Sequence, residues 1–141
     1  MEEKPMIKLI VGHKGSGKTK ALIQMATDAV ETSKGNVVCV EKGDTLKFDL
    51  THRVRLIDID DYSISGFDAC YGFYAGLFAG NYDITEVFVD GIFKVGGKDY
   101  VAFGVFVEKL AKLLETNGAT MTFTVSCEKE DLPAGIHKYI I

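Results

Sequence analysis

The sequence predicts an α/β domain of three layers, in which a mostly parallel sheet of five to six strands lies between helices. Short apolar runs that are typical of buried strands alternate along the chain with longer segments whose apolar side chains recur at helical spacing. Hydrophobic residues make up 47% of the chain and charged residues 26%, which is the balance of a globular domain. The length of 141 residues suits one domain better than two, so we expect residues 1–141 to form a single unit.

The first predicted elements are a strand, a glycine-rich turn and a helix. Residues 6–11 (MIKLIV) form a short apolar run that stops at a glycine, as a buried strand does. Residues 19–33 carry apolar side chains at helical spacing, and the segment 34–36 (KGN) places glycine just beyond the expected helix end. This order puts the glycine-rich turn between a strand and a helix.

Two further strands are predicted on either side of a polar loop. Residues 37–40 (VVCV) and 54–59 (VRLIDI) are apolar enough to be buried strands, and the second of them runs into a cluster of aspartates. Residues 41–51 contain a Lys-Gly-Asp sequence, which is typical of a turn, so we expect a loop there.

A second helix is predicted over residues 69–79. Ser65 and Asp68, in the sequence SGFD, fit a capping box, in which each side chain bonds to the backbone of the other residue at the start of a helix. Gly72 and Gly76 lie four residues apart on one face of this helix, so we expect another element to pack closely against it.

The remaining chain is predicted to hold two strands separated by a long helix, and then a final strand. Residues 86–90 (EVFVD) and 120–126 (TMTFTVS) have the β-branched and aromatic content of strands. Residues 100–116 have apolar side chains at helical spacing and stop at an Asn-Gly pair, whereas the glycine- and lysine-rich residues 91–99 predict a loop. Residues 138–141 (KYII) predict a sixth strand.

The glycine-rich turn matches the pattern G-x-x-x-x-G-K-[ST], which is typical of a loop that wraps nucleotide phosphates. Its glycines let backbone N–H groups point inward at phosphate oxygens, and the positive end of the following helix lies beneath them. The predicted nucleotide-binding residues of this glycine loop are Gly12, His13, Lys14, Gly15, Ser16, Gly17, Lys18 and Thr19. We expect Lys18 to reach the terminal phosphates and His13 to face solvent at the edge of the loop.

Asp90 is the second predicted part of the site, because it ends the apolar strand EVFVD. An aspartate at the end of such a strand is typical of a Walker B element, which holds Mg²⁺. We expect Thr19 and Asp90 to bind Mg²⁺, and we expect Lys18 and Asp90 to take part in catalysis.

In the glycine loop and Asp90 the chain resembles the P-loop NTPase superfamily, and its element order resembles that superfamily over nearly the whole length. More narrowly, it is similar to short bacterial P-loop proteins, some of which carry a twitching-motility ATPase label. The resemblance implies a P-loop NTPase-type domain that binds ATP and Mg²⁺. Twitching-motility motors are much longer and have a separate N-terminal domain, so the resemblance does not extend to a role in motility.

The chain departs from many P-loop ATPases at Gly91, where those proteins place a glutamate that orients the attacking water. A substitute would have to come from another strand end, although strand-end carboxylates are more often solvated and a terminal serine more often caps a strand. The candidates are Glu41, Asp58, Asp60 and Ser126.

Arginine is scarce in the chain, which contains only Arg53 and Arg55. Both belong to the start of the third predicted strand, away from the nucleotide, so we expect them to have structural or surface roles. An arginine at the transferring phosphate can contribute roughly 10³–10⁵ in rate. We therefore expect slow hydrolysis unless a protein partner or a second copy in a homo-oligomer supplies an arginine.

The expected function is a slow Mg-dependent ATPase, and two alternatives stay open. The first is a nucleotide-responsive binding module without useful hydrolysis, and the second is a phosphotransferase that acts on a small acceptor near residues 93–99. That segment either closes over phosphates or a partner through Lys94 and Lys98, or is a mobile surface turn. GTP is disfavoured because residues 128–131 (EKED) begin with glutamate, where guanine-specific sites have an amide or hydroxyl side chain.

Composition argues against several other classes. The net charge of −4 and the lack of a basic run argue against direct nucleic-acid binding. No apolar run approaches 18 residues and no secretory leader is apparent, so we expect no membrane span and a cytoplasmic location. Cys39, Cys70 and Cys127 are expected to be reduced and mostly buried, and their spacing from the histidines disfavours a zinc site.

Overall fold

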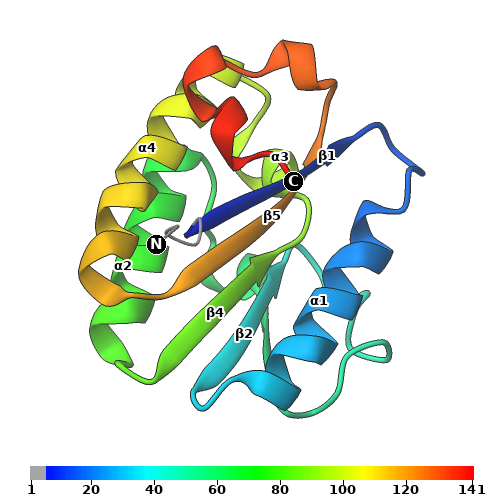
Figure 1. Cartoon of the computed structure of the whole chain (residues 1–141), viewed down its shortest axis with the longest axis vertical. Helices are drawn as coiled ribbons and strands as arrows, with labels where there is room; N and C mark the ends of the chain where they lie inside the picture. The colour runs from blue at the N-terminus through cyan, green and yellow to red at the C-terminus, as the bar shows by residue number, and fades with distance from the viewer. Residues whose placement is uncertain (1–5) are drawn as a thin grey trace.

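The computed structural model describes residues 6–141 and contains one five-stranded sheet with helices on both faces (Figure 1). The strands are β1 (Ile7–Gly12), β2 (Asn36–Glu41), β3 (Val54–Asp58), β4 (Ile84–Val89) and β5 (Thr120–Ser126). The α-helices are α1 (Lys18–Thr32), α2 (Phe67–Gly80), α3 (Ile92–Gly96) and α4 (Tyr100–Asn117). Three 3₁₀ segments are η1 (Ile59–Tyr62), η2 (Lys129–Asp131) and η3 (Ala134–Tyr139).

The expected α/β fold with a parallel sheet is confirmed. The strand order is β1-β5-β4-β2-β3, and each neighbouring pair is parallel. Strand β5 therefore lies between β1, which leads into the glycine loop, and β4, which leads to Asp90. Because parallel strands share one carboxyl edge, the glycine loop and Asp90 lie at the same edge of the sheet.

Alternating side chains along each strand bury both faces of the sheet. On one face, Cys39 and Phe88 pack with the apolar side of α1. On the other face, Val87, Val89 and Phe123 pack with residues of α2, α3 and α4. The helices thus form two outer layers, with α1 alone on its side in Figure 1. Strands buried on both faces read as continuous apolar runs, which is why the sequence predicted them well.

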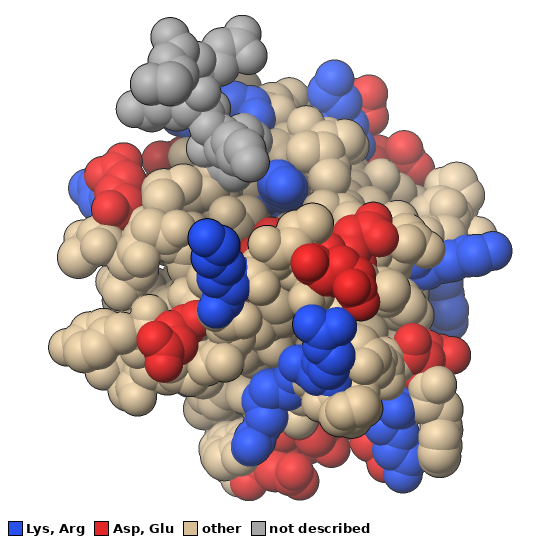
Figure 2. Space-filling model, turned by 60° about the horizontal axis from the view of Figure 1, so that its bottom comes forward, with Lys and Arg blue, Asp and Glu red and all other residues tan. Residues whose placement is uncertain are grey.

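The surface charges are mixed on the face shown in Figure 2. Lysine and arginine side chains are interspersed there with aspartate and glutamate, and neither sign forms a continuous patch. Over residues 6–141, none of the helices is both long and apolar enough to cross a membrane. The expectation that the chain has no secretory leader rests partly on residues 1–5, which lie outside the described residues.

The predicted capping box at the start of α2 is wrong. The N-cap is Gly66, with φ 88° and ψ 156°, and no side chain caps this end of the helix. The Gly66 N–H instead donates to the Val95 carbonyl oxygen at 2.9 Å, which ties the start of α2 to α3. The expected close approach at Gly72 and Gly76 is also wrong, because an added Cβ at either position would meet nothing within 4 Å.

The loop predicted over residues 91–99 is partly a helix. Ile92, Phe93 and Val95 of α3 are buried against the core, and the high glycine and lysine content of the segment had hidden this apolar pattern. Gly96 lies under the Phe67 ring, where an added Cβ would come within 2.2 Å of a ring carbon. A segment held in this way is part of the packed structure, and the prediction of a mobile surface turn is wrong for α3.

The predicted sixth strand at residues 138–141 is also wrong. The chain forms η3 up to Tyr139, and Ile136 is buried within that segment. Only one bridge, between Leu9 and Ile140, follows, together with a bond from the Ile141 N–H to the Leu9 carbonyl oxygen at 3.0 Å. The terminal segment therefore covers part of the free edge of β1 without extending the sheet.

The three cysteines are buried free thiols, as predicted. Burial, together with the nearby Asp90 and Glu41 carboxylates, raises the pKa of the Cys39 thiol to about 12. Burial also raises the pKa values of the Cys70 and Cys127 thiols to about 11. Because the thiolate is the reactive form, these groups are poor nucleophiles at neutral pH.

Candidate functional site

The glycine loop, residues 12–19, connects the end of β1 to the first turn of α1. Gly15 and Gly17 have φ values of 86° and 91°, in the left-handed region that favours glycine. An added Cβ at Gly12 would lie 2.5 Å from the Ser16 Oγ. The chain closes back on itself through a bond from the Ser16 N–H to the His13 carbonyl oxygen at 3.2 Å. The glycines are thus needed for the tight bend that the structure adopts.

Lys18 is the first residue of α1 and turns back over the glycine loop. Its side chain is buried, with 9% of its surface exposed, and its Nζ donates to the His13 carbonyl oxygen at 2.9 Å. The His13 side chain itself is exposed, as predicted. An ammonium group that is partly withdrawn from water gains stability from a counter-charge, so its position favours an anion within the loop.

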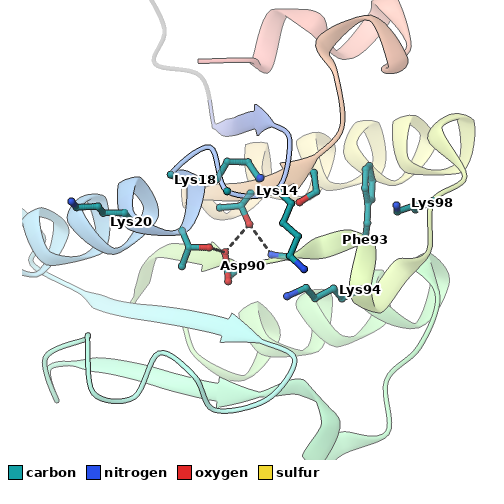
Figure 3. Close-up of a pocket in the computed structure, with 13 residues that line it drawn as sticks. Lys14, Lys18, Lys20, Asp90, Phe93, Lys94 and Lys98 are labelled. Carbon is teal, nitrogen blue, oxygen red and sulfur yellow. Dashed lines mark hydrogen bonds between the residues drawn. The ribbon is translucent and has the colours of Figure 1, made fainter.

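Asp90 accepts hydrogen bonds from two hydroxyl groups at the carboxyl edge of the sheet (Figure 3). The Thr19 Oγ1 donates to the Asp90 Oδ1 at 3.0 Å, and the Thr124 Oγ1 donates to the same oxygen at 2.8 Å. The Gly91 N–H donates to the Thr124 Oγ1 at 2.7 Å. These bonds join the glycine loop, β4 and β5 into one network.

Thr124, like Lys20, is a cavity residue that sequence analysis missed. It comes from β5, the strand between β1 and β4, and it is buried. A signal was present, because hydroxyl residues alternate with apolar residues along TMTFTVS and therefore share one face of the strand. The strand order was needed to show that this face lies beside Asp90.

A cavity of about 730 Å³ opens between the glycine loop and α3. One wall comes from the glycine loop and the start of α1, and the floor includes Asp90, Thr124 and Ser126. The opposite wall comes from Gly91, Phe93 and Lys94 (Figure 3). Cavities of this size suit a small organic ligand such as a nucleotide.

The charge of the cavity is opposite to that of the whole chain. Among the described residues that line it, Asp90 is the single carboxylate, whereas five lysines bring their net formal charge to +4 in a chain of net charge −4. The lysines are Lys14, Lys18, Lys20, Lys94 and Lys98. The ion pairs between described side chains lie elsewhere and use none of these lysines. This concentration of positive charge favours an anionic ligand.

Glu41 and Asp58, two of the candidate bases, lie outside this cavity. The Glu41 carboxylate is buried, with 3% of the residue exposed, and accepts bonds from the Thr45 N–H, the Thr45 hydroxyl and the Leu46 N–H at 3.2, 2.7 and 2.9 Å. Asp58 accepts bonds from the Gly43 N–H at 2.9 Å and the Asp60 N–H at 3.0 Å. Both carboxylates therefore hold the chain that follows β2 and β3, whereas Ser126 does line the cavity.

Replacement of Glu41 with alanine is expected to destabilise the fold by about 1–3 kcal/mol, because three donors would lose a buried acceptor. Thermal or urea unfolding measures this change. Asp44→Ala is the matched control, since Asp44 lies in the same loop and is 69% exposed in its pair with Lys47. The control is expected to change the free energy of unfolding by less than about 1 kcal/mol. Equal effects of the two substitutions would contradict this role of Glu41.

The two arginines lie away from the cavity, as predicted. Arg53 donates to the Glu31 carboxylate at 3.1 Å and to the Val30 carbonyl oxygen at 2.6 Å, so it joins the start of β3 to the end of α1. Arg55 lies in β3 and lines a different hollow. Neither guanidinium group is available to a ligand in the glycine loop of the same chain.

The arrangement can hold an anion beside a small cation. A glycine loop at the start of a helix, with the Lys18 ammonium group beside it, suits phosphate oxygens, and the hydroxyl and carboxylate oxygens of Thr19 and Asp90 suit a hard divalent ion. Among residues 6–141 there is no cluster of three His, Cys, Asp or Glu side chains that could hold a metal by itself. No model of a known protein family matches the chain, and no curated protein matches it.

Proposed function

We propose that the protein is a P-loop NTPase-type protein that binds Mg-ATP in the glycine loop and hydrolyses it slowly. The observation that carries this proposal is the bond between Thr19 and Asp90 directly beside a glycine loop covered by Lys18. A P-loop nucleotide site needs these same parts: an anion cradle, a lysine above it, and a hydroxyl and a carboxylate for the metal.

Magnesium fits the two oxygen ligands that the chain offers. Mg²⁺ is usually held by one or two protein oxygens together with phosphate oxygens and water, and less often by an all-protein cage. The Thr19 hydroxyl and the Asp90 carboxylate lie within hydrogen-bonding distance of each other, so one ion could contact both oxygens if the neutral hydroxyl turned its proton away. The ion would neutralise part of the phosphate charge, while Lys18 and the loop amides bind the remaining phosphate oxygens.

Slow hydrolysis is proposed because, over residues 6–141, the cavity lining includes no free carboxylate to orient water. The carboxylate that does line it, that of Asp90, already accepts bonds from two hydroxyl groups, and the next residue is Gly91. Ser126 is the candidate from sequence analysis that lines the cavity. A protein partner or a second copy of the chain would therefore raise the rate by supplying an arginine or a base.

ATP is proposed in preference to GTP because the EKED segment is used by its own turn. Glu128 and Asp131 cap η2 reciprocally, and the Glu128 N–H donates to the Asp131 Oδ2 at 3.0 Å. In a guanine-specific site the aspartate carboxylate would accept bonds from the base, whereas here the Asp131 carboxylate accepts a bond from its own turn.

The free buried thiols support a cytoplasmic location, where cysteines stay reduced.

Calorimetry with magnesium and a non-hydrolysable ATP analogue tests the proposal. We expect the purified protein to bind the analogue more tightly than the matching GTP analogue, and to release phosphate from ATP more slowly than the roughly 1–100 s⁻¹ of kinases. Absence of any heat of binding at millimolar nucleotide would refute the proposal. Binding without phosphate release would favour the nucleotide-responsive module, and ADP formed only with a small acceptor would favour the phosphotransferase.

A further inference from the structure

Helix α3 presents one charged side chain to the cavity, while its apolar side chains pack into the core. Of its five residues, Ile92, Phe93 and Val95 are buried, whereas Lys94 is exposed on the cavity side. The Phe93 ring packs edge-on against the Phe103 ring, with their centroids 5.1 Å apart. A helix anchored in this way fixes the direction of its one exposed charged side chain.

The Lys94 side chain runs back along Gly91, the residue that follows Asp90. An added Cβ at Gly91 would lie 3.2 Å from the Lys94 Cδ and 3.5 Å from its Cε, so the aliphatic part of the lysine lies against this glycine. Figure 3 shows Lys94 extending toward Asp90, whereas Lys98 lies beyond Phe93. Among the residues of α3, Lys94 thus supplies the positive charge that points toward Asp90, one of the two proposed metal ligands.

The position of a bound triphosphate follows from the two walls of the cavity. In the proposed complex the glycine loop and the start of α1 would hold the phosphates from one side, and Thr19 and Asp90 would hold a metal that neutralises part of their charge. The terminal phosphate of a triphosphate would then lie near Asp90, in the cavity that Lys94 also lines. A diphosphate would end before reaching Lys94.

We infer that Lys94 contacts the terminal phosphate and makes the site prefer a nucleoside triphosphate to a diphosphate. The inference rests on the proposed function and deepens it, because it assigns a specificity-determining residue within the chain. No described carboxylate forms an ion pair with Lys94, so its charge is available to a ligand. Lys94 would thereby supply a positive charge at the terminal phosphate, although both arginines of the chain lie away from the cavity.

Dissociation constants for Mg-ADP and for a non-hydrolysable Mg-ATP analogue test this inference by calorimetry. In the Lys94→Ala variant, the affinity for the ATP analogue is expected to fall about 10- to 100-fold, which is the loss of one charge-assisted contact. The affinity for ADP is expected to change by less than about twofold. Lys94→Arg, which keeps the charge, is expected to retain the preference for the triphosphate.

Lys112→Ala is the charge-matched control. Lys112 is exposed near the end of α4, and α4 leads to the amino edge of β5, at the opposite edge from the cavity. This variant is expected to bind both nucleotides as the wild type does. If Lys94→Ala weakens both nucleotides equally, or neither, the inference is overturned while the proposed function stands. If the wild type binds neither nucleotide, the proposed function fails and the inference fails with it.

Discussion

The Lys18→Ala variant is expected to bind Mg-ATP roughly 30-fold to several-thousand-fold more weakly than the wild type. This range corresponds to the loss of about 2–5 kcal/mol when one partner of a buried, charged contact is removed. Lys18 is 9% exposed and lines the cavity, and its ammonium group has the His13 carbonyl oxygen as an acceptor. Calorimetry or a fluorescent nucleotide analogue measures the change in affinity.

Lys34→Ala provides a control of equal charge for the Lys18 substitution. Lys34 is exposed and follows the far end of α1, so its removal is expected to leave nucleotide affinity unchanged. Circular dichroism of both variants checks that each is folded. If a folded Lys18→Ala protein bound the nucleotide as tightly as the wild type does, the nucleotide would not lie in the glycine loop.

The Asp90→Asn variant is expected to lose the dependence of nucleotide binding on magnesium. Asparagine keeps an oxygen that can accept bonds from Thr19 and Thr124, so the network survives while the charge that attracts the cation is removed. Outer-sphere partners of metal sites contribute about 10- to 100-fold in affinity or activity, so a direct ligand is expected to contribute at least roughly 100-fold. Titrations with ATP in magnesium and in EDTA measure the effect.

The Asp61→Asn variant removes the same charge from an exposed position in η1, outside the cavity. Its titrations in magnesium and in EDTA are expected to match those of the wild type. Phosphate release gives a second readout, since the Asp90 variant is expected to lose its magnesium-dependent part. Unchanged magnesium dependence in Asp90→Asn would place the cation on other ligands and remove a central element of the proposed function.

The glycine loop and the position of Asp90 could be predicted from the sequence because they depend on short stretches of chain. The bend between β1 and α1 needs glycines at fixed positions, and these appear directly in the sequence. Asp90 follows an apolar strand, and a parallel arrangement alone puts it at the same edge as the loop. Both inferences need only local pattern and the direction of the strands.

Thr124 and α3 could not be predicted in the same way, because their roles depend on packing between distant segments. Thr124 is 34 residues from Asp90 and meets it only because β5 lies between β1 and β4. Segment 91–99 resembles a loop by composition, but Ile92 and Phe93 find a hydrophobic pocket formed by α2, α4 and β5. Glu41 looked like a solvated strand end because the loop that wraps its carboxylate was not visible in the sequence.

The partner of β1 within the sheet suggests an order of events during translation. Strand β1 pairs with β5, and its other edge meets the described part of the chain at a bridge between Leu9 and Ile140. At about 5–20 residues per second, a ribosome would release β1 many seconds before its partners exist. Strands β2, β3 and β4 could associate earlier, whereas β1 would wait as an apolar segment that is prone to aggregation. The edge of the sheet that carries the glycine loop would then be completed only after β5 has been translated, so an anion could be held there only once the chain extends to at least Ser126.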